Sequence, residues 1–233
     1  MGNLEIIKGG LAAAGVLLIL SAVPGHAEVA IAGKAGTLGA GAELTVGLAR
    51  QLNARLGING YSYSDRREAS GNEYDGEAKL RTGTGLLDWH PGGGGFRLTG
   101  GVVYNDTTIE GTSIPPASGV YDIGGAPVPV SFVRSLNAKA DFDPIVPYAG
   151  LGWGNAVAAG KKVGFFIDLG VIFQGKADVT LTPDIPAGSP IDSTPGARIA
   201  LDVLLQREEQ ELEDDAADYD LYPVLSIGLS YKF

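Results

Sequence analysis

The 233-residue chain contains no cysteine, and this absence removes several classes of site at once. Without thiols there is no disulfide framework, no thiolate metal site and no cysteine to carry a lipid after an export signal. Positive charge is also scarce, because 17 Lys and Arg residues stand against 27 Asp and Glu residues, which gives a net charge of −10. This balance argues against a general nucleic-acid-binding surface, which needs basic patches.

Long hydrophobic runs are missing as well. The longest apolar run, residues 11–23, has 13 residues, fewer than the roughly 20 that a membrane-spanning helix needs. A lysine precedes this run, and Gly25 and Ala27 supply the small residues that a signal peptidase requires. We therefore expect residues 1–27 to be a Sec signal peptide and residues 28–233 to form the mature domain. The alternative, an N-terminal membrane anchor, fits the turn-forming flank less well.

What the sequence does contain is a repeated alternation of apolar with small or polar residues. A period of two residues is typical of strands with one apolar face. The alternating segments are 38–48, 52–58, 78–86, 96–104, 145–154, 165–173 and 225–233. Each is roughly ten residues long, and a tilted strand needs about 9 to 11 residues to cross a bilayer. If the last strand ends in the periplasm, parity requires an eighth strand near residues 29–35.

The face opposite the apolar one carries charges of both signs, which can pair across a narrow lumen. An Arg or Lys side chain at the lipid midplane would cost about 2–4 kcal/mol, so in a membrane barrel these side chains point inward. The predicted luminal charge network is Glu43, Arg55, Lys79, Arg81, Arg97 and Asp168. The alternation alone also allows a soluble sandwich in which this face is simply solvated.

Aromatic residues favour the membrane barrel, because such barrels gather Trp and Tyr into belts at both interfaces. The belt predicted at the end with short turns contains Trp89, Phe96, Trp153 and Phe165, joined by Tyr231 and Phe233 at the chain end. The belt predicted at the opposite end contains Tyr61, Tyr63, Tyr104, Phe173 and Tyr222. One detail does not fit, because the alternation past Ile58 puts Tyr61 and Tyr63 on the luminal face.

The connections between the segments also differ in length. The connections at 49–51, 90–95 and 155–162 are short, whereas those near 64–76, 105–143 and 175–221 are long and rich in polar residues, Gly and Pro. Outer-membrane barrels have short periplasmic turns and long outer loops. The sequence therefore predicts an all-β, eight-stranded antiparallel up-and-down transmembrane β-barrel.

Two of the long outer loops carry further signals. Proline and glycine pairs predict an irregular loop over 105–143. Leucines at near-helical spacing predict a short helix in the last loop, where residues 202–220 hold nine acidic residues against Arg207. This acidic segment can hold divalent cations that bridge it to lipopolysaccharide phosphates, or steer cationic solutes. Its spacing is not that of a calcium loop, which favours a solvated acidic helix.

The C-terminal residues resemble a known signal. Ser226, Gly228, Tyr231 and Phe233 fit the pattern by which the barrel-assembly machinery recognises outer-membrane proteins. The mature chain is similar to the small eight-stranded barrels of the OmpA, OmpX and OmpW type. This resemblance implies an integral protein of the Gram-negative outer membrane, with lipid and lipopolysaccharide as its partners and both termini in the periplasm. It also implies a monomer with a structural or surface-interaction role. The OmpW likeness implies an alternative, a narrow pore for small or hydrophobic solutes.

An enzyme is the third reading, because some barrels of this size modify lipids with a His and Ser pair. The mature chain has one histidine, His90, in a turn assigned to the periplasmic rim, away from any outer-leaflet substrate. General-base chemistry needs a histidine within hydrogen-bond reach of a nucleophile, and no motif places one there. The Gly92–Gly95 run lacks the GK[ST] of a phosphate loop. We expect no catalytic residues, no cofactor and no bound metal.

Overall fold

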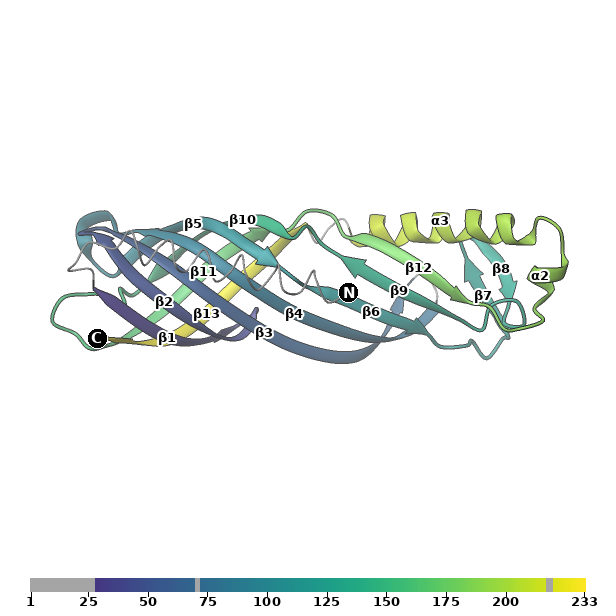
Figure 1. Cartoon of the computed structure of the whole chain (residues 1–233), viewed down its shortest axis with the longest axis horizontal. Helices are drawn as coiled ribbons and strands as arrows, with labels where there is room; N and C mark the ends of the chain where they lie inside the picture. The colour runs from purple at the N-terminus through teal and green to yellow at the C-terminus, as the bar shows by residue number, and fades with distance from the viewer. Residues whose placement is uncertain (1–27, 70–71, 217–219) are drawn as a thin grey trace, which may run out of the picture.

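The computed structural model describes residues 28–69, 72–216 and 220–233, so the expected signal peptide lies outside the described residues. It shows an antiparallel β-barrel that continues into a long extension at one end (Figure 1). The eight barrel strands are β1 (Val29–Gly36), β2 (Gly39–Ala49), β3 (Leu52–Ala69), β4 (Asn72–Trp89), β5 (Phe96–Asn105), β10 (Ile145–Trp153), β11 (Val163–Phe173) and β13 (Leu221–Lys232). The predicted eight-stranded fold is confirmed.

The barrel strands follow the order β4-β3-β2-β1-β13-β11-β10-β5, and the pairing of β4 with β5 closes the ring. The first and last strands of the described chain pair directly, since Ala32 lies opposite Ser230. The C-terminus and the turns after β2, β4 and β10 gather at one end of the barrel, called here the C-terminal end (Figure 1). The opposite end carries the extension.

Alternation along the strands sets the two faces of the barrel. Five of the six strands whose facing the alternation predicts turn their apolar face outward, as β11 does with Phe165 and Leu169. In β4 the predicted face over 78–86 is wrong by one residue. Leu86 is buried inside the barrel, whereas Leu87 is 52% exposed on the outside. A one-residue shift moves every side chain of a strand to the other face.

The extension grows out of the hairpin of β3 and β4, which have 18 residues each and run well past the other barrel strands (Figure 1). Outside the barrel β4 pairs with β6 (Thr108–Ser113), β6 with β9 (Ser135–Asp141), and β9 with β12 (Asp178–Asp184). A separate hairpin joins β7 (Val120–Ile123) to β8 (Ala126–Pro129). The prediction of an irregular loop over 105–143 is therefore wrong, because that segment forms four short strands.

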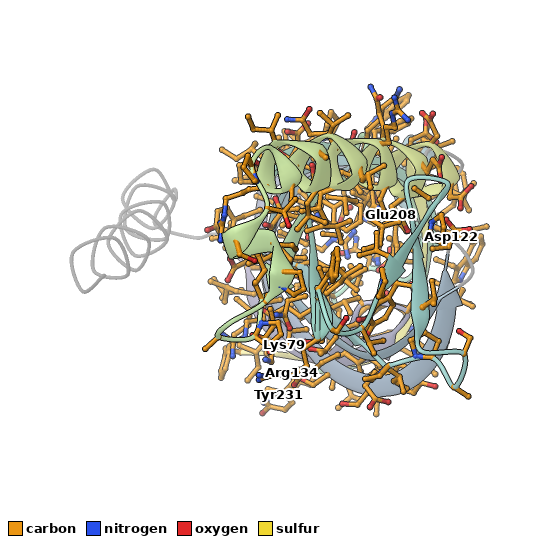
Figure 2. All side chains as sticks on the ribbon, turned by 90° about the vertical axis from the view of Figure 1, so that its right-hand side faces the viewer. Lys79, Asp122, Arg134, Glu208 and Tyr231 are labelled. Atoms are coloured by element: carbon orange, nitrogen blue, oxygen red, sulfur yellow. The ribbon has the colours of Figure 1, made fainter. Side chains whose placement is uncertain are left out.

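Two α-helices complete the extension, and a short 3-10 helix lies at the opposite end of the barrel. The 3-10 turn η1 (Pro91–Gly93) lies at the C-terminal end, and α2 (Pro190–Ser193) leads into the 20-residue helix α3 (Ala197–Ala216). The predicted helix in the last long loop is thus present. Seen from the extension end, α3 lies across the top of the curved sheet, with the β7–β8 hairpin beside it (Figure 2). In the part of the chain that is described, no helix has the length and apolar character to span a membrane.

The extension has a hydrophobic core of its own, separate from the barrel. Leu201 and Leu205 of α3 pack into it, which is what the helical leucine spacing requires. Its buried members are Tyr121, Ile123, Val128, Val133, Leu136, Leu181, Ile191, Leu201 and Leu205. The extension is therefore a packed body and not a set of independent loops.

Candidate functional site

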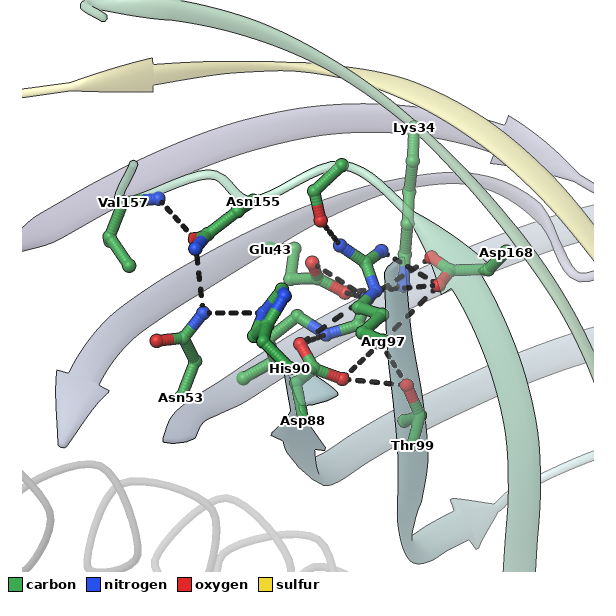
Figure 3. A network of polar contacts seen from close by, with 12 residues as sticks. Lys34, Glu43, Asn53, Asp88, His90, Arg97, Thr99, Asn155, Val157 and Asp168 are labelled. Carbon is green, nitrogen blue, oxygen red and sulfur yellow. Dashed lines mark hydrogen bonds and ion pairs between the residues drawn. The ribbon is translucent and has the colours of Figure 1, made fainter. Parts of the chain in front are cut away.

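The centre of the barrel holds a buried network of charged side chains, among them Glu43, Asp88 and Asp168 (Figure 3). Arg55 of β3 contacts all three of these carboxylates. Arg55 Nη1 donates to Oε1 of Glu43 at 3.2 Å and to Oδ2 of Asp168 at 3.1 Å. Arg55 Nη2 donates to Oδ1 of Asp88 at 2.9 Å. One guanidinium therefore joins carboxylates from three other strands, β2, β4 and β11, across the lumen.

Two further cations complete the network. Arg97 of β5 donates from Nη2 to Oδ1 of Asp168 at 2.7 Å, and from Nη1 to the carbonyl of Gly154 at 2.5 Å. Lys34 of β1 donates from Nζ to Oε2 of Glu43 at 2.9 Å. Three cations thus face three carboxylates.

This balance has an energetic reason. Burying an unpaired ion costs free energy, because the ion loses its hydration. In a buried ion pair, the mutual attraction offsets this cost only when the geometry is good and further hydrogen bonds are formed. Each charged side chain of the network is at most 8% exposed. The hydroxyl of Thr99 adds a hydrogen bond of 2.7 Å to Asp88. The network is consequently neutral, and each of its charges is paired with at least one opposite charge.

The structure brings together four of the residues predicted for the luminal network, Glu43, Arg55, Arg97 and Asp168. It corrects the placement of the other two. Lys79 lies in the extension, where its Nζ is 3.0 Å from Glu77 and both side chains are more than 40% exposed. Arg81 is exposed on the outside of β4. Both errors follow from the shifted facing of β4 and from its continuation past the barrel.

Asp88 is not among the predicted luminal charges, because the predicted facing of β4 places it on the outside. Asp88 is 1% exposed, and it belongs to the inward set that ends at His90. The exposed Trp89 between them signals this facing, because a tryptophan at a barrel rim points outward. Lys34 is also absent from the predicted network. It lies on the inward face of β1, between Gly33 and Ala35, which are both exposed on the outside.

An apolar layer closes the lumen on the extension side of the network. Its buried members are Leu86, Val103, Val146, Tyr148, Ile172 and Val224. The Tyr148 ring lies against Gly170, where an added Cβ would come within 2.3 Å of the tyrosine hydroxyl. The cavity between this layer and Arg55 measures about 20 Å³, room for about one water molecule. Side chains therefore fill the barrel at this level, as expected for eight strands.

His90 fastens the C-terminal end of the barrel. The ring is fully buried, with Nε2 3.0 Å from Nδ2 of Asn53 and Nδ1 3.1 Å from the carbonyl of Gly94. Asn53 also donates to Asn155 at 3.2 Å, so three turns are tied together (Figure 3). Burial lowers the pKa of His90 and favours the neutral ring. Both ring nitrogens are engaged by an amide and a carbonyl, and this arrangement holds turns in place without activating a hydroxyl.

The predicted aromatic belt residues lie on the outside of the strand ends at the C-terminal end. Trp153 and Phe96 are direct cross-strand partners and are 62% and 38% exposed. Trp89 and Phe165 are also exposed. Of the assembly-signal residues, Tyr231 and Phe233 point outward with their rings edge to face at 5.6 Å, whereas Ser226 and Gly228 face inward.

The acidic helix α3 uses several of its carboxylates to bind backbone N–H groups. Glu209 accepts from the N–H of Leu181 at 2.7 Å, and Glu213 accepts from that of Val179 at 3.2 Å. Both donors lie on β12, the last strand of the sheet. Glu208 is 1% exposed and accepts from the N–H of Gly124 at 2.8 Å. These acids therefore dock the helix, and among the described residues no group of three or more His, Asp or Glu could hold a metal ion.

Comparisons with known proteins agree with this fold. No family model matches the chain, and no curated protein matches it. Among solved structures, Acinetobacter baumannii CarO2 is 19% identical with a TM-score of 0.54, covering 88% of this chain and 98% of that one. Acinetobacter baumannii CarO is 18% identical with a TM-score of 0.52 and the same coverage. The chain therefore has the fold of the small eight-stranded outer-membrane β-barrels.

Proposed function

We propose that this protein is an integral outer-membrane barrel with a structural or surface-interaction role, in which a filled barrel anchors the extension at the cell surface. The observation that carries the proposal is the outer wall of the barrel. Large apolar side chains are exposed there on every barrel strand, among them Ile31, Leu48, Ile58, Leu87, Val102, Leu151, Leu169 and Ile227.

This apolar outer surface supports the proposal that the barrel is surrounded by lipid. Soluble monomers rarely expose contiguous apolar patches larger than a few hundred Å². Here the exposed apolar residues continue around the ring, while Glu43 and Arg55 are buried inside it. A polar interior with an apolar exterior is the arrangement of membrane barrels.

The orientation follows from the two ends. The C-terminal end has short turns and exposed Trp89 and Trp153, which suit the periplasmic interface. The extension then faces the environment, with α3 and the β7–β8 hairpin available to partners. Outer-leaflet lipopolysaccharide would surround the barrel, and the barrel-assembly machinery would act on the C-terminal strand with Tyr231 and Phe233. We propose a monomer with no enzymatic role, because His90 is buried away from the extension.

A narrow pore is the alternative that the OmpW resemblance implies. The charge network around Arg55 and the apolar layer around Tyr148 support a non-conducting lumen instead. A path for solutes would require both layers to rearrange. The surface role is therefore the function that the geometry supports best.

Cysteine labelling tests the location and orientation. The chain has no cysteine, so each introduced thiol is unique. Glu211→Cys is on an exposed position of α3, and Ala159→Cys is on an exposed position of the turn after β10. In intact cells a membrane-impermeant maleimide should label Glu211→Cys at once, and Ala159→Cys only after the outer membrane is permeabilised. Equal labelling of both variants in intact cells, or of neither, would refute the proposal.

A further inference from the structure

Between the barrel and the extension lies an internal chamber that the anchoring role does not use. Its volume is about 270 Å³. The barrel contributes Leu38 and Ile172, and the extension contributes Ile109 and Phe142. Below it lies the apolar layer that closes the lumen, since Leu38 and Tyr222 touch both. The chamber is thus a dead end and not a segment of a channel.

The lining sets the chemistry of what fits. No charged residue of the described chain lines the chamber, and most of the wall is carbon. An ion would lose its hydration there without a partner, which is strongly unfavourable. A cavity of about 150 Å³ with apolar walls accommodates benzene. The chamber therefore has room for a neutral apolar molecule of about ten carbon atoms.

The wall also contains the polar side chains Thr82, Asn105, Thr107, Gln174 and Tyr222, and one of them adds selectivity. Asn105 lines the chamber and is 7% exposed. Within residues 28–69, 72–216 and 220–233 its side-chain amide forms no hydrogen bond, and it is not one of the side-chain groups sealed off without a partner, so it is open to the space of the chamber. The hydroxyl of Thr82, beside it in the wall, already accepts from Asn59 at 3.0 Å but retains its own proton to donate. Buried amides normally find a partner, and a ligand with one hydroxyl or carbonyl group would supply it.

Access to the chamber is easiest above the turn between β1 and β2. β2 pairs with β3 only as far as Gly60, while β3 continues to Ala69 (Figure 1). Beyond Gly60 that side of β3 has no neighbouring strand in the described chain. Tyr61 sits on the inward register there, opposite Leu80, yet it is 50% exposed. At this point, next to Leu38, the wall around the chamber has no strand beside β3 on the side away from β4, among the residues that the structure describes.

We infer that this chamber binds a small neutral molecule with an apolar body of about ten carbons and one hydrogen-bonding group, whose polar end meets Asn105. The inference is independent of the surface role, because it needs only the folded barrel with its extension. Naphthols are probes of the right size and polarity, and naphthalene is the matched probe without the hydroxyl.

Equilibrium dialysis of 2-naphthol against the barrel in lipid nanodiscs tests this, with protein-free nanodiscs subtracted for partition into lipid. The wild type should bind one equivalent saturably. Ala140→Phe fills the chamber and should weaken binding at least tenfold. Ala149→Phe adds the same volume on the exposed outside of β10 and should bind as the wild type does. If Ala140→Phe fails to show a heat-modifiable gel shift, Ala177→Leu fills the same chamber from another strand junction.

A second comparison tests the polar contact. The wild type should prefer 2-naphthol to naphthalene by about two- to tenfold, the value of one neutral hydrogen bond. Asn105→Leu should remove this preference while naphthalene still binds. Binding no greater than in protein-free nanodiscs, or equal binding by wild type and chamber-filled variants, would overturn the inference. A preference that survives in Asn105→Leu would overturn the assigned role of Asn105.

Discussion

Arg55 Nη2 donates to Oδ1 of Asp88 at 2.9 Å, with both side chains at most 2% exposed. The two residues come from neighbouring strands β3 and β4, and their contact lies inside the barrel. Through Arg55, Asp88 is connected to Glu43 on the adjacent strand β2 and to Asp168 on β11 across the lumen. The lumen is thus closed by groups that depend on one another for charge compensation.

Removal of the Arg55 guanidinium should therefore lower the stability of the folded barrel. Arg55→Met leaves three buried carboxylates with two cations, and loss of one partner of a buried pair typically costs about 3–5 kcal/mol. We expect the free energy of unfolding in urea, measured in lipid vesicles, to fall by about that amount. The double variant Arg55→Met with Asp88→Leu restores the charge balance and should recover most of the loss.

The matched control is an exposed pair of the same residue types. Arg134 Nη1 lies 3.3 Å from Asp184 in the extension, and the two side chains are 64% and 41% exposed. Exposed pairs contribute about 0–1 kcal/mol, so Arg134→Met should change little. Equal effects of Arg55→Met and Arg134→Met would show that the luminal network does not stabilise the barrel.

The outward face of β11 offers a test of the lipid environment. Leu169 is 54% exposed near the middle of that strand. In a bilayer Leu169→Arg should lower the free energy of unfolding by about 2–4 kcal/mol. Val203 of α3 is 44% exposed. Val203→Arg makes a similar change there and should have little effect on the free energy of unfolding. If both variants behave alike in vesicles, the outer wall does not face lipid.

Helix α3 should protect the last strand of the sheet. Glu209 accepts from the N–H of Leu181 at 2.7 Å, and hydrogen bonds to charged groups contribute about 1.5–3 kcal/mol. In Glu209→Ala the amide of Leu181 should exchange with deuterium on the order of ten- to a hundredfold faster. Glu211→Ala, at an exposed position of the same helix, is the control. Unchanged exchange at Leu181 would mean that the carboxylate does not protect this edge.

The docking of α3 should also depend on pH. Burial raises the pKa of Glu208, and the nearby Glu211 and Asp122 raise it further, although the N–H of Gly124 opposes the shift. A carboxyl whose pKa is higher in the folded state stabilises that state below its unfolded pKa, and this contribution is lost as the pH rises through the folded pKa. Deuterium exchange at Gly124 should therefore slow as the pH falls from neutral toward the ordinary glutamate range, after correction for the intrinsic rate.

Glu208→Gln provides the check, because glutamine keeps an acceptor for Gly124 but does not titrate. This variant should exchange slowly at neutral pH and lose the dependence on pH. A pH dependence that persists in Glu208→Gln would have to come from another group.

How far the sequence predicts this fold depends on how clearly each strand alternates. In β11 and β13 large apolar residues alternate with small or polar ones, so both existence and facing follow from period two. In β4 the adjacent Leu86 and Leu87 and the threonines, which suit either face, allow both facings, and the facing predicted over 78–86 is wrong. The position of Trp89 at the strand end resolves the ambiguity.

The extension could not be predicted in the same way. β6 and β9 have six and seven residues and a weak alternation. β6 pairs with β4 beyond the barrel, and β9 pairs with β6. Such strands form because a long neighbour presents an unpaired edge, which local sequence does not reveal. The helix α3 was predictable, since Leu201 and Leu205 mark its buried face. Its use of Glu208 and Glu209 as acceptors for backbone N–H groups depends on tertiary contacts.

The central claim is that side chains close the lumen, and single-channel recording tests it most directly. Residues 28–233 would be refolded, checked for a heat-modifiable gel shift and for protease protection in vesicles, and then fused into a planar bilayer. The charge network and the apolar layer around Tyr148 predict no discrete conductance steps. Reproducible steps whose size changes in Arg55→Met or Glu43→Gln would contradict the claim and make these residues part of a pore.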